Sequence, residues 1–218
     1  SHIPWVLDIP QDSTPDGPIG TLRGHVARAN PQAKTMIEAL TTSREDVKST
    51  VLEDEVMVLF NGPVHHYVTP KFYKDTKPST GKVVSTWNYS AVQVYGTATV
   101  FFDSKSPILE EFLSKQLDDL ARIGEEQIMG FTGEEGKKTP WKVSEAPESY
   151  VQLLKKAIIG VQIEVERMEG KFKMSQELGE GDREGTVEGF RALGTEEGEQ
   201  IARTIEVRAA VKKEKDGK

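Results

Sequence analysis

The chain has 218 residues, a formal net charge of −7 and no cysteine. Its length suits one large domain or two small ones, and the missing cysteine excludes disulfides, thiolate metal sites and cysteine nucleophiles. The negative charge argues against an open surface for duplex DNA, because such a surface neutralises phosphates with Lys and Arg. No apolar run reaches the roughly 20 residues of a membrane-spanning helix, and no signal-peptide pattern opens the chain. We therefore expect a cytoplasmic protein.

The first part of the chain predicts short strands joined by turns. A turn rich in Pro and Gly is expected at 9–20, between the first two strands. Asn30 and Pro31 suit the N-cap and the first turn of a helix that ends near Leu40. The polar segment 41–54 is predicted to be a mobile loop. Strands are predicted at 1–8, 21–28, 55–60 and 64–69, followed by a helical turn at 70–73 and a loop at 74–80.

The strongest strand signal lies in the middle of the chain. Apolar and small residues alternate with others there, which is the two-residue period of a strand. The residues predicted to share one face are Val92, Val94, Gly96, Ala98, Val100 and Phe102. The cluster Trp87-Asn88-Tyr89 precedes them and adds large π-faces and an amide. A purely structural strand does not need this cluster, whereas a strand that lines a planar ligand with polar edges does.

The last part of the chain mixes helices with one more strand. An amphipathic stripe predicts a helix over 107–128, and alternation predicts a strand over 159–166, turned by Glu169-Gly170. Asp182 is expected to cap a helix of about twelve residues, and Thr195 begins a final helix whose mostly polar surface predicts a place outside the core. A short helix after Pro147 should bury Tyr150, Val151, Leu154 and Ala157.

These elements predict a mainly β (α+β) fold with about six or seven strands. The helices do not alternate regularly with the strands, which argues against a doubly wound parallel sheet. An antiparallel β-barrel, closed or partly closed and with peripheral helices, fits better.

Arg28 is the first candidate for a binding role. It precedes the predicted helix that starts after Asn30, and a guanidinium beside free N–H groups at a helix N-terminus suits a phosphate. The alternative is a surface arginine next to a capping asparagine.

Two further segments carry binding chemistry. Trp87 and Asn88 could bind a flat heterocycle by stacking and hydrogen bonding, or they could belong to an aromatic cluster with local hydrogen bonds. The segment Lys171-Phe172-Lys173-Met174-Ser175-Gln176 could close a phosphate or carboxylate pocket, or it could be an edge strand with solvated lysines.

The histidines do not predict a metal site. His65 and His66 are neighbours in a strand and point to opposite faces, and the chain offers only four histidines and no cysteine. His2 and His25 lie on different predicted strands and could converge. The glycine-rich nucleotide motifs and the serine-hydrolase motif are absent.

Three sequence blocks occur in the order and spacing of a known family. The blocks are Gly24-His25-Val26-Ala27-Arg28-Ala29-Asn30-Pro31, Val84-Ser85-Thr86-Trp87-Asn88-Tyr89-Ser90-Ala91-Val92 and Gly170-Lys171-Phe172-Lys173-Met174-Ser175-Gln176. Over about residues 1–176 the chain resembles the PaiB-type family, the FMN-binding negative transcriptional regulators. Ser1-His2-Ile3-Pro4 is similar to the family's Thr-His-Leu-Pro strand.

The resemblance implies an antiparallel FMN-binding split barrel that forms a homodimer, with FMN near the subunit interface. It implies a split-barrel domain over 1–176 and a helical extension over 177–218. It also implies FMN-binding positions at His2, His25, Ala27, Arg28, Asn30, Trp87, Asn88, Lys173, Ser175 and Gln176.

The chain departs from the family pattern in two informative places. The family's strands before the His-Leu-Pro block are missing, so we expect them to precede residue 1. Glu177 stands where the family usually has Asn.

The leading hypothesis is a flavin-dependent redox protein or flavin-linked regulator. One rival is a non-enzymatic dimeric regulator that binds protein or DNA. Another is a haem-binding or haem-degrading split barrel, in which His2, His25, His65 or His66 would supply the axial ligand.

Overall fold

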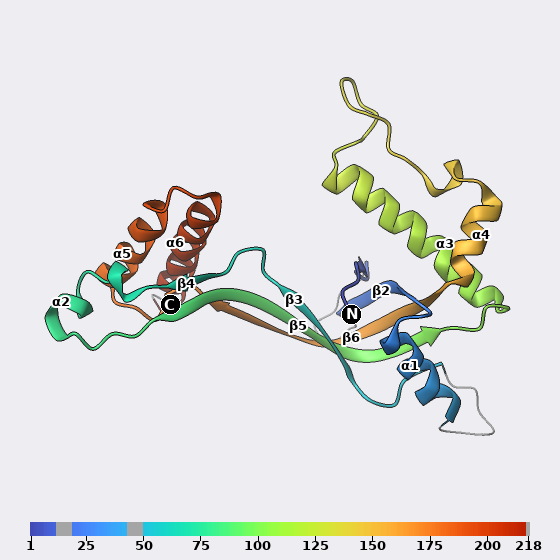
Figure 1. Cartoon of the computed structure of the whole chain (residues 1–218), viewed down its shortest axis with the longest axis horizontal. Coiled ribbons are helices and arrows are strands. Elements are labelled where there is room, and N and C mark those ends of the chain that lie inside the picture. Colours follow the sequence, from blue (N-terminus) through green and yellow to red (C-terminus); the bar gives the residue numbers. More distant parts are fainter. Residues whose placement is uncertain (12–18, 43–49, 217–218) are drawn as a thin grey trace. The chain divides into compact units, whose positions relative to one another are not determined.

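The computed structural model describes residues 1–11, 19–42 and 50–216. Most of the predicted turn at 9–20 and half of the predicted loop at 41–54 lie outside the described residues. The chain divides into two compact units (Figure 1). Unit 1 comprises residues 1–57 and 95–167, and unit 2 comprises residues 58–94 and 168–218.

Strands and helices alternate irregularly along the chain. The strands are β1 (Val6–Asp8), β2 (Gly20–Ala27), β3 (Val56–Asn61), β4 (His66–Val68), β5 (Thr86–Phe101) and β6 (Ile158–Lys173). The α-helices are α1 (Pro31–Thr42), α2 (Thr76–Thr80), α3 (Pro107–Arg122), α4 (Glu148–Lys156), α5 (Glu180–Arg191) and α6 (Glu196–Asp216). Shorter helical segments are η1 (Pro70–Phe72), the π-helix η2 (Ile123–Ile128) and η3 (Val143–Glu145). No helix in the described ranges has the length and apolar character needed to cross a membrane.

Six strands form one antiparallel sheet in the order β1-β2-β6-β5-β3, with β4 also paired to β5. Within the described residues the sheet remains open. The predicted antiparallel architecture is therefore confirmed. The alternation that predicted the central strand is confirmed as well, because Val94, Ala98 and Val100 are all buried. β5 begins at Thr86, earlier than that alternation, and β6 continues through the predicted turn at Glu169-Gly170.

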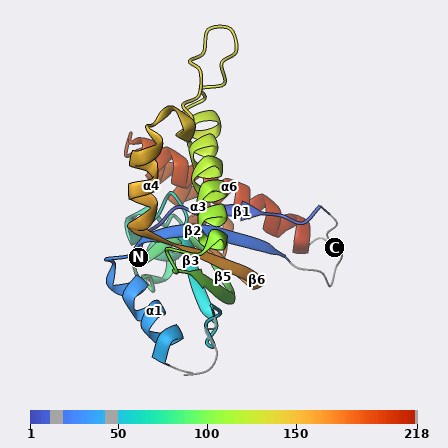
Figure 2. The same ribbon diagram turned by 90° about the vertical axis from the view of Figure 1, so that its right-hand side faces the viewer.

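In unit 1, α3 lies across β1 and β2 (Figure 2). Arg23 of β2 is buried beneath it and donates hydrogen bonds to Asp8 of β1 (2.9 Å) and Asp119 of α3 (2.6 Å). The hydrogen bond from Arg23 lowers the pKa of Asp8 below its usual range. Gln116 of α3 accepts a third bond at 3.3 Å. A buried guanidinium is tolerable because acceptors from two elements surround it.

The predicted inner face of α4 is wrong for three of its four residues, since only Val151 is half-buried. Tyr150 and Leu154 are 55% and 48% exposed, and Ala157 is also exposed. The buried residue is Lys155, whose ammonium bonds Glu110 and Ser114 of α3 at 2.7 Å each. Helical periodicity located the helix, but the side that faces α3 also carries the buried Lys155 and its ion pair with Glu110.

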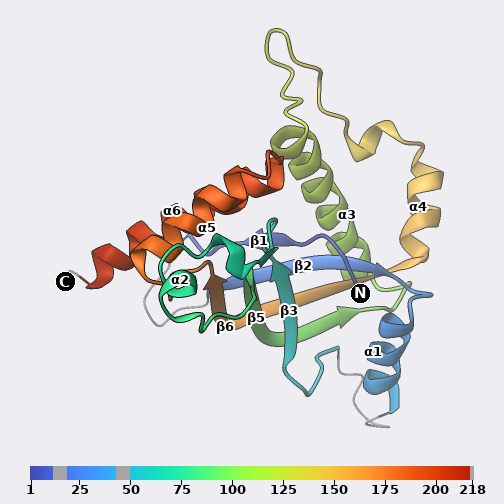
Figure 3. The ribbon, with the colours of Figure 1, turned by 60° about the vertical axis from the view of Figure 1, so that its left-hand side comes forward.

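Unit 2 has its own hydrophobic core, in which α5 and α6 lie side by side (Figure 3). Ile201 and Ile205 of α6 are fully buried against Val68, Met174 and Phe190. The prediction that the last helix lies outside the core is therefore wrong. α6 has few apolar residues, so its sequence pattern looks polar overall. A narrow apolar stripe along one side of the helix nevertheless packs into the core.

Asp182 does not cap the helix that follows it. It lies in the first turn of α5, and its buried carboxylate accepts hydrogen bonds from the backbone N–H groups of Asp75 (2.8 Å) and Thr76 (3.1 Å) and from the Thr76 hydroxyl. These groups begin α2, which occupies part of the predicted loop at 74–80. Asp182 thus satisfies donors at the start of a different helix, distant in sequence.

Candidate functional site

Arg28, the predicted phosphate ligand, is engaged by the fold of unit 1. Its guanidinium donates to the carbonyl oxygens of Phe102 (2.8 Å), Lys156 (3.4 Å) and Ile158 (3.5 Å). These carbonyls lie where β5 ends and β6 begins. Asn30 caps α1, since its Oδ1 accepts from the N–H of Gln32 at 2.9 Å. Both side chains therefore have structural partners, and their contact with a ligand stays a prediction.

The other candidates of unit 1 differ in accessibility. His25 lies on β2 two residues from Arg23, so both side chains point toward α3. Its Nδ1 is buried and has no partner among the described residues. Burial lowers the pKa of His25, which favours the neutral imidazole. Ala27 and His2 are exposed.

In unit 2, β4 and β5 present aromatic side chains on one face. Tyr67 lies opposite Trp87 in the antiparallel register, with ring centroids 6.4 Å apart. The Trp87 indole N–H donates to His65 Nδ1 at 3.3 Å, and these two rings are stacked at 5.9 Å. Trp87 and Tyr67 are 49% and 44% exposed. We call His65, Tyr67 and Trp87 the aromatic face.

Lys173 brings a positive charge to the start of β5, beside the backbone of Trp87. It comes from the end of β6, and its Nζ donates to Thr86 Oγ1 and, at 3.2 Å, to the carbonyl oxygen of Trp87. The carboxylate of Glu177 lies 3.5 Å from the same nitrogen. An ammonium has three N–H donors, so an anionic ligand here would compete with Glu177.

Asn88 and Ser175 lie on the opposite, buried face of unit 2. Both are fully buried, and Asn88 Nδ2 donates to Ser175 Oγ at 3.0 Å. Ser175 has a φ of +60°, unusual for a residue other than glycine. Gln176 folds back, because its amide accepts from the N–H of Met174 and donates to the carbonyl of Phe172 at 2.6 Å. These predicted ligands fix the chain around Lys173.

The structure thus gathers the predicted residues into two groups. Lys173 bonds the backbone of Trp87 in unit 2, whereas Arg28 belongs to unit 1. The single pocket predicted from all three stays a prediction. Sequence reasoning missed Tyr67 and the support that His65 gives Trp87. A strand over 64–69 would have His65 and Tyr67 on one side, but only the folded structure places them beside Trp87.

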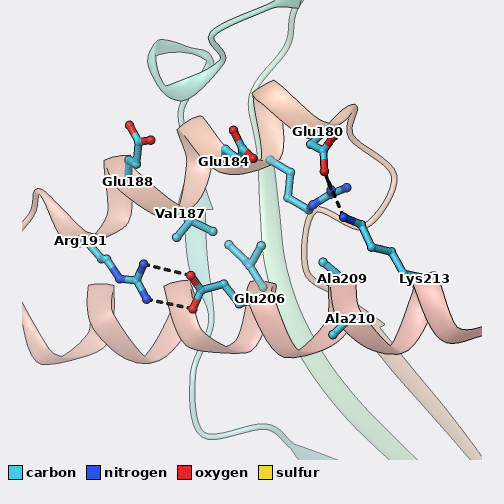
Figure 4. Close-up of a pocket in the computed structure, with 11 residues that line it drawn as sticks. Glu180, Glu184, Val187, Glu188, Arg191, Glu206, Ala209, Ala210 and Lys213 are labelled. Carbon is cyan, nitrogen blue, oxygen red and sulfur yellow. Dashed lines mark hydrogen bonds and ion pairs between the residues drawn. The ribbon is translucent and has the colours of Figure 1, made fainter.

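A pocket of about 430 Å³ lies between α5 and α6 (Figure 4). Val187, Ala209 and Ala210 line its middle, and an ion pair spans the two helices at each end. Arg191 bonds both oxygens of Glu206 at 3.0 and 2.9 Å, and Lys213 bonds Glu180 at 3.0 Å. Both are exposed ion pairs that join α6 to α5. In the described part of the chain, no three His, Asp or Glu side chains gather into a metal-binding group.

Comparisons with known proteins add a family to this geometry. A family model described as "Putative FMN-binding domain" matches residues 1–167. An uncharacterized protein of Aspergillus fumigatus is 60% identical over 99% of this chain and 84% of its own length. The protease synthase and sporulation protein PAI 2 of Bacillus subtilis is 28% identical over 85% of this chain and 72% of its own length. The flavocytochrome Anf3 from Azotobacter vinelandii, with a TM-score of 0.34 and 12% identity over 70% of this chain and 50% of that one, is too distant to argue from.

Proposed function

Because this chain belongs to the FMN-binding domain family, whose cofactor is FMN, we propose that it binds FMN at the aromatic face of unit 2 and works as a flavin-dependent redox protein. The observation that carries the proposal is the lysine ammonium of Lys173 bonded to the backbone of Trp87, whose ring is half-exposed beside Tyr67. A regulatory role is the rival, and the net charge of −7 does not favour direct DNA contact.

The aromatic face and the neighbouring Lys173 together fit both parts of FMN. Trp87 and Tyr67 offer the surface on which a planar ring system stacks, and Lys173 offers a cation for the phosphate. The Trp87 indole N–H donates a hydrogen bond to His65 Nδ1. The Trp87 ring, on which the flavin ring would stack, is therefore oriented before FMN binds. FMN, when bound, supplies hydride and electron transfer, and these residues supply binding and orientation.

We also propose that the open sheet is a split barrel completed in a homodimer, in which a second copy covers exposed apolar side chains. Large apolar surfaces left exposed by a single chain commonly mark interfaces. Leu59 of β3 is 49% exposed, like Trp87. The implied FMN-binding positions of unit 1, His2, His25, Ala27, Arg28 and Asn30, stay part of this proposal. The domain division at residue 176 also stays part of this proposal. We further propose a cytoplasmic location, which the absence of cysteine supports.

Titration of the purified protein with FMN, followed by quenching of flavin fluorescence, tests the site. Trp87→Ala and Lys173→Gln should each raise the Kd for FMN by about tenfold or more, because ring stacking and a charge-assisted hydrogen bond each contribute about 1–3 kcal/mol.

Matched controls exist in unit 1. Trp141 is 46% exposed, close to Trp87, and Lys142 is an exposed lysine. Trp141→Ala and Lys142→Gln should leave the Kd unchanged. A wild-type protein that does not take up FMN, or controls that lose as much affinity as the site variants, would overturn the proposal.

A further inference from the structure

We propose that Arg208 of α6 is a positioning residue for the FMN site, acting on Lys173 through the strand that carries it. The inference rests on the proposed function and goes beyond it, because α6 lies outside residues 1–167 that the family model matches. The helical extension would then be a working part of the cofactor site.

The contact between α6 and β6 is direct. The guanidinium of Arg208 lies over the ring of Phe172, with its central carbon 3.2 Å from the ring centroid. One helical turn further on, the ammonium of Lys212 donates to the carbonyl oxygen of Gln176 at 3.0 Å. Two basic residues on one side of α6 therefore hold both ends of the segment 172–176.

The contact at Phe172 lies next to the lysine of the proposed site. Phe172 contacts Arg208 of α6, and the ammonium of the following residue, Lys173, donates to the Thr86 hydroxyl and to the carbonyl oxygen of Trp87. Because neighbouring side chains of a strand point to opposite faces, Arg208 would act on Lys173 through the backbone of β6.

The segment needs such support because much of its conformation depends on side chains. Ser175 has a positive φ, and its hydroxyl is held by buried Asn88. The amide of Gln176 closes the bend from the other side. A residue in a sparsely populated backbone conformation persists when its surroundings over-determine it. Arg208 adds a contact at the residue next to Lys173.

α6 is suited to hold a fixed position. Ile201 and Ile205 anchor it in the core, and the ion pairs Arg191–Glu206 and Glu180–Lys213 join it to α5 (Figure 4). Glu206 and Lys213 face α5, whereas Arg208 and Lys212 face the segment 172–176. The same helix therefore uses different sides for its own anchoring and for positioning β6.

The test compares FMN with riboflavin, which lacks the phosphate, on Arg208→Ala. If Arg208 acts through Lys173, the variant should weaken FMN binding by about threefold to tenfold, the scale of a cation–π contact. Riboflavin binding should stay within about twofold of the wild type. Arg208→Lys keeps a cation over the ring and should restore most of the affinity for FMN.

A double-mutant cycle with Lys173→Gln tests whether Arg208 affects FMN binding through Lys173. In the Lys173→Gln background, Arg208→Ala should cause no further loss, since residues that act as a unit are not additive. Arg203→Ala is the control on the same helix, because Arg203 pairs with Glu199 and its side chain is 71% exposed. It should not change the affinity for either ligand.

The outcomes separate the two proposals. If Lys173→Gln leaves FMN binding unchanged, the proposed site itself is wrong. If Lys173→Gln weakens binding but Arg208→Ala does not, or if the two losses add, Arg208 is not a positioning residue. Equal losses of FMN and riboflavin affinity on Arg208→Ala would indicate general disruption of unit 2 and would also overturn the inference.

Discussion

Asp182 shows how a single carboxylate can join segments that are distant in sequence. Burial by itself would raise its pKa, but hydrogen bonds from Thr76 and from the backbone N–H groups of Asp75 and Thr76 outweigh burial and lower the pKa. The charged form is therefore the one that the fold binds. Its local sequence predicted an N-cap, because an Asp just before a helical pattern is a common cap, and nothing in that sequence points to Thr76.

The lowered pKa predicts how stability depends on pH. The unfolded chain binds the proton more tightly than the folded chain does, so this stabilisation is present above the usual carboxyl value of 3.8 and is lost as the pH falls through the lower folded pKa. Asp182→Asn should reduce the free energy of unfolding at pH 7 by about 1.5–3 kcal/mol, the range for hydrogen bonds to a charged group.

Urea unfolding at pH 7 and at pH 3 measures this effect. The deficit of Asp182→Asn relative to the wild type should shrink at the lower pH, because the wild-type carboxylate loses its advantage there. Asp75→Asn, at an exposed neighbouring carboxylate, is the control and should show the wild-type pH dependence. A deficit of equal size at both pH values would argue against the role given to Asp182.

At the scale of elements, α5 packs closely because three glycines follow one another at four-residue intervals. Gly181, Gly185 and Gly189 lie on one side of the helix, facing the segment around Phe72. A Cβ atom on Gly189 would lie 2.2 Å from the Phe72 ring, and one on Gly185 would lie 2.2 Å from the Phe72 carbonyl oxygen. The spacing was visible in the sequence, but its packing partner was not.

Gly189→Ala should therefore destabilise unit 2, by about 1–3 kcal/mol, although alanine favours helices over glycine. The steric cost is large because the buried core around Phe190 holds the Phe72 ring. Gly181→Ala is the matched control. The three atoms nearest to its Cβ would belong to the exposed side chain of Asp75, which can move aside. Thermal unfolding of the two variants should show a loss for Gly189→Ala alone, and equal midpoints would contradict this account of the packing.

For the whole molecule, the open sheet and the exposed apolar side chains predict association of two copies. Light scattering on the purified protein should give twice the chain mass of 24.2 kDa. The midpoint of thermal unfolding should rise with protein concentration, because association stabilises the folded state by mass action. A monomer with a concentration-independent midpoint would rule out the homodimer while leaving FMN binding at the aromatic face to be tested separately.

The sequence by itself determined the type of most elements, the antiparallel character of the sheet and the family. Two-residue alternation reports burial on one face of a strand, and Val94, Ala98 and Val100 follow it closely. The family followed from motif blocks, and the match over 1–167 agrees with them. These features are local or repeat along the chain, so a linear pattern can carry them.

Only the tertiary structure decided what the candidate residues touch. The guanidinium of Arg28 donates hydrogen bonds to three backbone carbonyl oxygens. Asn88 is buried against Ser175, and the ring of Trp87 lies beside His65 and Tyr67. Arg208 reaches Phe172 across 36 residues of sequence. Such pairings depend on strand register and helix orientation, which are set by the summed packing of distant segments. Residue type and spacing therefore predicted which chemistry is available, and folding decided which of these side chains lie close together.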